Sequence, residues 1–63
     1  MSFRTAAKIA NIKPSEICYN LMCVKMARIA ADMANGKVPT DSTLDLLNYD
    51  IDLVVLLEEE KLG

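Results

Sequence analysis

A line of acidic and amide side chains runs along residues 41–60 and is the feature best suited to chemistry. At about 100° per residue these side chains share one side of a helix. The line consists of Asp41, Asp45, Asn48, Asp52 and Glu59. Carboxylates one turn apart offer the oxygen ligands that Mg²⁺ prefers when it assists a phosphorylated substrate. Asp41 and Asp45 are therefore candidate ligands of a possible Mg²⁺ ion.

A second polar line lies upstream, where Lys25 and Arg28 follow one another at helical spacing. Both cations can bind phosphate oxygens, while the polar side chains of residues 45–49 can hydrogen-bond a base or a sugar. The candidate ligand-binding residues are Lys25, Arg28, Asp45, Asn48 and Tyr49. In the alternative interpretation, Asp45 and Asp52 pair with Lys25 and Arg28 across a helical hairpin and specify its register.

Three helices are expected to position these side chains, at about residues 3–11, 14–35 and 41–60 of a single domain, 1–63. Ser2 can cap the first helix, Pro14 suits the first position of the second, and Gly36 can terminate it. Thr40 or Asp41 can cap the third helix. The predicted fold is all-α, with a short N-terminal helix followed by an antiparallel hairpin of two long helices.

Apolar residues cover two sides of the third helix, so a single hairpin partner can bury only one of them. One side consists of Leu44, Leu47, Ile51, Val54 and Val55. The other consists of Leu46, Tyr49, Leu53, Leu56 and Leu57. The second helix has its own apolar face, which we expect to include Cys18, Met22, Met26, Ile29 and Met33. The uncovered side predicts that the chain assembles with copies of itself into a helical oligomer.

The composition excludes several other classes of protein. The 63 residues are 52% hydrophobic with a net charge of −2, so no strong positive field attracts nucleic acid or an anionic membrane. The longest apolar run, 53–57, is far shorter than a membrane span. Two cysteines without histidine form no zinc motif, and their placement fits a reducing cytosol. We expect a cytoplasmic protein, with Arg4 and the acidic run 58–60 exposed to solvent.

Four segments together resemble a MazG-like group of small phage and bacterial proteins related to the all-α NTP pyrophosphohydrolases. They are Phe3-Arg4-x-Ala6-Ala7-x-Ile9-Ala10, Lys13-Pro14-Ser15-Glu16, Met22-x-x-Lys25-Met26-Ala27-Arg28 and Asp41-Ser42-x-x-Asp45-Leu46-x-Asn48-Tyr49. The resemblance covers nearly all of this chain but only the C-terminal part of a typical member. It implies a helical dimer or tetramer that hydrolyses nucleoside triphosphates with Mg²⁺.

The chain departs from that family at its metal site, which combines an EExxE helix with an ExxD helix. Asp45 matches the aspartate of the second motif, but Ser42 stands in place of its glutamate and Asp41 is the nearest substitute. The EExxE helix is absent. We therefore expect a non-catalytic nucleotide-binding oligomer that sequesters a nucleotide or nucleotide-derived signal between subunits. The alternatives are a structural or protein-binding helical oligomer and a minimal Mg²⁺-dependent nucleotide pyrophosphohydrolase.

Overall fold

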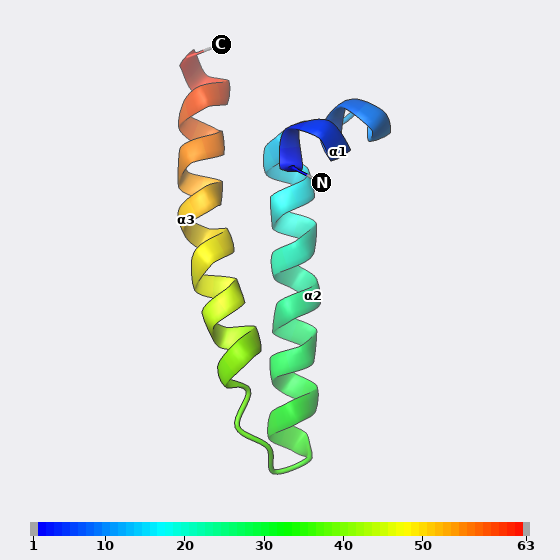
Figure 1. Cartoon of the computed structure of the whole chain (residues 1–63), viewed down its shortest axis with the longest axis vertical. Helices are drawn as coiled ribbons and strands as arrows, with labels where there is room; N and C mark the ends of the chain where they lie inside the picture. Colours follow the sequence, from blue (N-terminus) through cyan, green and yellow to red (C-terminus); the bar gives the residue numbers. More distant parts are fainter. Residues whose placement is uncertain (1, 63) are drawn as a thin grey trace.

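A computed structural model describes residues 2–62, which form three α-helices and no strand (Figure 1). These helices are α1 (Phe3–Ala10), α2 (Pro14–Ala34) and α3 (Thr40–Leu62). The two long helices run antiparallel, and α1 lies at the end of the hairpin where α3 ends (Figure 1). The predicted all-α fold, with a short first helix and a hairpin of two long ones, is confirmed.

Local signals in the sequence explain where the helices begin and end. The Ser2 hydroxyl accepts the backbone N–H of Thr5, and Asn11 ends α1 in the left-handed region at φ 58°. Pro14 begins α2, and Gly36 follows its end at φ 70°, a conformation that glycine adopts without strain. The third helix begins at Thr40, so Thr40 and Asp41 lie inside its first turn and not at the expected cap, and the Thr43 hydroxyl donates to the Pro39 carbonyl at 2.6 Å.

The contact between α2 and α3 is narrow. In the part of the chain that the structure describes, the buried apolar side chains are Ala7, Cys18 and Leu56. Half-buried residues accompany them along the two long helices, among them Ile17, Leu21, Met22, Lys25, Ile29, Asp45, Leu46, Tyr49 and Leu53. The Cys18 thiol also donates a hydrogen bond to the Tyr49 carbonyl at 3.1 Å. This core is small, and it is not exclusively apolar.

The apolar face expected on α2 is covered only in part, since Cys18 is buried and Met22 and Ile29 are half-buried. Met26 and Met33 are 58% and 66% exposed, whereas Lys25 lies half-buried against α3. Apolar residues cover nearly half of the α2 circumference, and helical spacing does not show which part of that arc meets a neighbour. On α3, the side containing Leu56 is covered and the side containing Ile51 is exposed.

An isolated chain leaves much of its surface in water. Its accessible surface is 4732 Å², against about 4,000 Å² for a compact monomer of 7.0 kDa. The molecule measures 44 × 20 × 15 Å with a radius of gyration of 13.3 Å, where a compact domain of this length would have about 10.6 Å. No helix within residues 2–62 has both the length and the apolar character needed to cross a bilayer.

Candidate functional site

The structure pairs two of the predicted ligand-binding residues with each other. The Lys25 ammonium of α2 lies 2.8 Å from the Asp45 carboxylate of α3, and the two side chains are 14% and 47% exposed. The lysine stem therefore lies along apolar surface while its charged head meets a carboxylate. This pair connects the two long helices and is one of the contacts expected if the polar lines specify the register of the hairpin.

The other three predicted ligand-binding residues do not converge on this pair. Arg28 and Asn48 are exposed, and no side-chain hydrogen bond or ion pair within residues 2–62 involves either one. Tyr49 is half-buried, and its ring meets the Phe3 ring edge-on with centroids 5.8 Å apart. The three clefts described below are lined by residues other than these five.

The candidate metal ligands lie at the loop end of α3. Asp41 is exposed, and Asp45 already accepts the Lys25 ammonium. Within residues 2–62, no three or more histidine, cysteine, aspartate or glutamate side chains are grouped so as to hold a metal ion. A divalent cation there would have to compete with Lys25 for Asp45 and obtain its remaining ligands from water or a bound substrate.

Two contacts at the other end of the hairpin involve residues that we expected to be solvated. Glu60 of α3 accepts both the backbone N–H of Ser15 at 3.1 Å and its hydroxyl at 2.6 Å. It therefore satisfies an N–H group in the first turn of α2, where Lys13 provides no side-chain cap. Arg4 of α1 binds the neighbouring Glu59. The sequence contains no local signal for contacts between residues this far apart.

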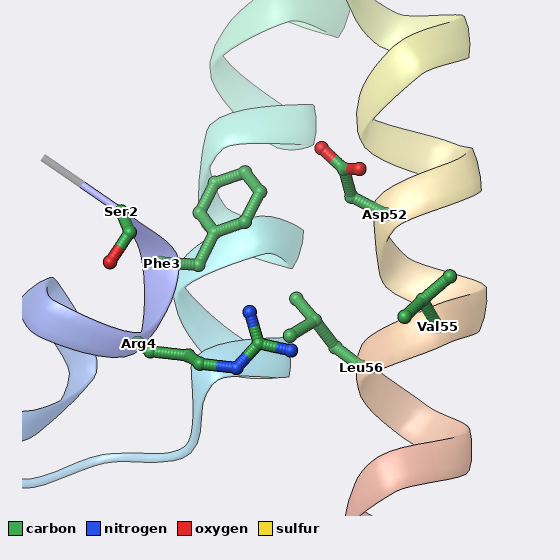
Figure 2. A pocket seen from close by; sticks show the side chains of 6 residues that line it. All are labelled: Ser2, Phe3, Arg4, Asp52, Val55 and Leu56. Atoms are coloured by element: carbon green, nitrogen blue, oxygen red, sulfur yellow. The ribbon is translucent and has the colours of Figure 1, made fainter.

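A small cleft lies between α1 and α3, on the side of the hairpin that α1 occupies (Figure 2). Its volume is about 250 Å³, and it is lined by Ser2, Phe3, Arg4, Asp52, Val55 and Leu56. The Arg4 side chain extends across it towards α3, and the Asp52 carboxylate points towards the side where the Phe3 ring lies (Figure 2). Burial raises the pKa of the nearby Cys18 thiol, and the charges of Asp52 and Asp50 raise that pKa further.

The opposite side of the hairpin carries two apolar hollows that follow one another along the junction of α2 and α3. One hollow of about 420 Å³ lies towards the loop, and another of about 240 Å³ lies towards the α1 end. We call the apolar residues that line them the apolar seam: Tyr19, Met22, Met26, Leu46, Leu47, Leu53 and Leu57. Asp50 and Glu16 are the acidic residues on its borders.

Comparison with protein-family models, with characterised proteins and with solved structures finds no match to this chain. The resemblance to the MazG-like group therefore stays a hypothesis that depends on the four sequence segments alone.

Proposed function

We propose that this chain is a helical association module, a structural or protein-binding element that assembles when a second copy covers the apolar seam. The observation that carries the proposal is the exposure of large apolar side chains on both long helices. Tyr19 and Met26 of α2 are 59% and 58% exposed, and Leu47 and Leu57 of α3 are 56% and 51% exposed. Contiguous apolar surface rimmed by polar residues is typical of protein–protein contacts.

The exposed area agrees with the area that such a contact needs. The isolated chain exposes roughly 700 Å² more than a compact monomer of its mass. A stable interface of standard size buries about 800 Å² on each partner. Two hairpins packed seam to seam would form a four-helix arrangement, in which side chains that are half-exposed in one chain become core. Assembly would also stabilise a chain whose own core is small.

Association is better supported than nucleotide binding by the surroundings of Lys25. In the nucleotide-binding hypothesis Lys25 and Arg28 bind phosphate, but the Lys25 ammonium lies 2.8 Å from Asp45. A phosphate would have to compete with that carboxylate for the Lys25 ammonium. The Mg²⁺-dependent hydrolase hypothesis meets the same obstacle, since it needs Asp45 as a ligand.

Sedimentation velocity tests the proposal through Leu47→Glu, a change in the hollow of the apolar seam that lies towards the loop. Leu47 is half-exposed in the single chain, so the substitution costs a monomer little but places a carboxylate in the interface. We expect the wild-type chain to sediment as a dimer or larger oligomer and the variant as a monomer of 7.0 kDa with retained helicity.

Ile9→Glu is the matched control for this experiment. Ile9 is 72% exposed on α1, away from the seam, so the same substitution there should leave the oligomer intact. A wild-type chain that stays monomeric at high micromolar concentration would overturn the proposal. A Leu47→Glu chain that sediments like the wild type would place the interface elsewhere and overturn the role of the seam.

A further inference from the structure

A second exposed surface lies on α3 next to the apolar seam, because Leu44 and Ile51 lie one helical turn from Leu47. Its apolar members Leu44, Ile51 and Val55 are 54%, 56% and 50% exposed. Polar side chains lie beside them at helical spacing. We call this surface the acidic strip: Asp41, Leu44, Asn48, Ile51, Asp52 and Val55.

Charge is divided unevenly between α3 and the rest of the chain. Helix α3 carries seven acidic residues and one basic residue, whereas residues 2–39 carry six basic and two acidic ones. Arg4 pairs with Glu59 and Lys25 pairs with Asp45. No ion pair within residues 2–62 involves Asp41, Asp52 or Glu58. The acidic strip therefore combines apolar side chains with negative charge that the described residues do not neutralise.

This charge pattern disfavours a second α3 as the occupant of the strip. By helical projection, Asp52 borders the apolar residues on one side and Glu58 borders them on the other. A second α3 packed here in either direction would set carboxylates against carboxylates, which opposes association. A helix with an apolar stripe between basic residues has the complementary pattern.

The cleft at the end of the strip adds a place for one side chain of such a helix (Figure 2). Its volume of about 250 Å³ is below the roughly 300–1,000 Å³ typical of small-molecule pockets. Phe3, Val55 and Leu56 offer apolar and aromatic surface to an aliphatic stem, and Asp52 offers a carboxylate to its charged head. Arg4 also lines the cleft, but its guanidinium pairs with Glu59, so Asp52 is the lining carboxylate that can accept a second cation.

We propose that the acidic strip binds a basic amphipathic helix of another protein, with one lysine or arginine side chain in the cleft between α1 and α3. This inference goes beyond self-association, because it concerns a different surface and a different partner. It does not require the apolar seam to be covered.

Fluorescence anisotropy tests this proposal. The probe is a labelled synthetic peptide of leucine and lysine, in which the leucines follow helical spacing. The full chain should bind this peptide and should not bind a counterpart in which glutamate replaces lysine. Ile51→Lys places a like charge in the middle of the strip and should weaken binding more than about tenfold. Asp52→Asn removes the carboxylate of the cleft and should weaken binding about three- to fivefold, the range of an exposed ion pair.

Asp50→Asn is the matched control, because it removes the same charge two residues away on the border of the apolar seam. An equal effect of the two substitutions would show non-specific attraction to an acidic protein and overturn the proposal. Equal binding of the lysine and glutamate peptides would also overturn it. Ile51→Lys should leave the sedimenting mass unchanged. Dissociation of the oligomer by this variant would instead identify the strip as a contact between copies of the chain and overturn the proposal, whatever happens at the seam.

Discussion

The two sides of the hairpin differ in how they are covered. On one side α1 lies against the hairpin, and Arg4 and Phe3 reach across to Glu59 and Tyr49. On the other side, residues 2–62 provide no third helix, and the apolar seam faces water. The comparison indicates that the covered side stabilises the fold of one chain, whereas the uncovered side is suited to contact with another.

The strongest test of this comparison replaces each of two neighbouring leucines by alanine in separate variants. Leu56, which lines the cleft between α1 and α3, is 4% exposed, and Leu57, in the apolar seam, is 51% exposed. We expect Leu56→Ala to lower the free energy of unfolding by about 2–4 kcal/mol, the range for a buried leucine, at every protein concentration. Leu57→Ala should cost less than about 1 kcal/mol in the monomer, because half of its side chain is already in water.

Urea unfolding followed by circular dichroism at several protein concentrations measures both effects. The loss caused by Leu57→Ala should grow as concentration rises and the oligomer forms, since only the oligomer covers that side chain. A concentration-independent loss equal to that of Leu56→Ala would mean that the seam is already core in the single chain. The comparison between the two sides would then fail.

A smaller effect separates the two neighbouring glutamates near the end of α3. Glu60 is half-buried and accepts two hydrogen bonds from Ser15. Glu59 pairs with Arg4 at the surface, where the Glu59 side chain is 49% exposed and the Arg4 side chain 61%. We expect Glu60→Ala to cost about 1 kcal/mol, as the loss of a helix cap does. Glu59→Ala should cost less than about 0.5 kcal/mol because water screens its ion pair. Thermal unfolding of both variants measures which one loses more stability. Glu58→Ala, at a glutamate without a described partner, is the control.

The sequence predicted the elements well because their signals are local. Ser2, Pro14 and Gly36 act within their own turns, so ends of the first two helices could be inferred from them, and the short connector between the two long helices predicted the hairpin. The predicted ends of the helices lie within about two residues of those in the structure. The helix α3 continues to Leu62, and Glu60 near its end accepts hydrogen bonds from Ser15, 45 positions away, a contact that no local signal predicts.

The candidate site was harder to predict because apolar residues cover much of both long helices. Helical spacing placed Lys25 and Asp45 on polar lines, but the same spacing is compatible with a ligand site and with an ion pair. The rotation of α2 about its own axis decides between these arrangements, and it depends on packing around Cys18, the most deeply buried side chain of the described core. Periodicity within one helix does not encode that rotation.

A last test concerns Lys25, and it separates association from nucleotide binding. Lys25→Met keeps the apolar stem and leaves Asp45 half-exposed, so we expect stability to change by less than about 1 kcal/mol and the oligomer to persist. Lys37→Met, in the exposed connector, removes the same charge and serves as the control.

Calorimetry with a panel of mono-, tri- and cyclic nucleotides completes the test. Wild-type binding tighter than about 1 mM, lost in Lys25→Met and retained in Lys37→Met, would favour a nucleotide site. Unchanged assembly without such binding would leave Lys25 as a contact between the two helices of the hairpin.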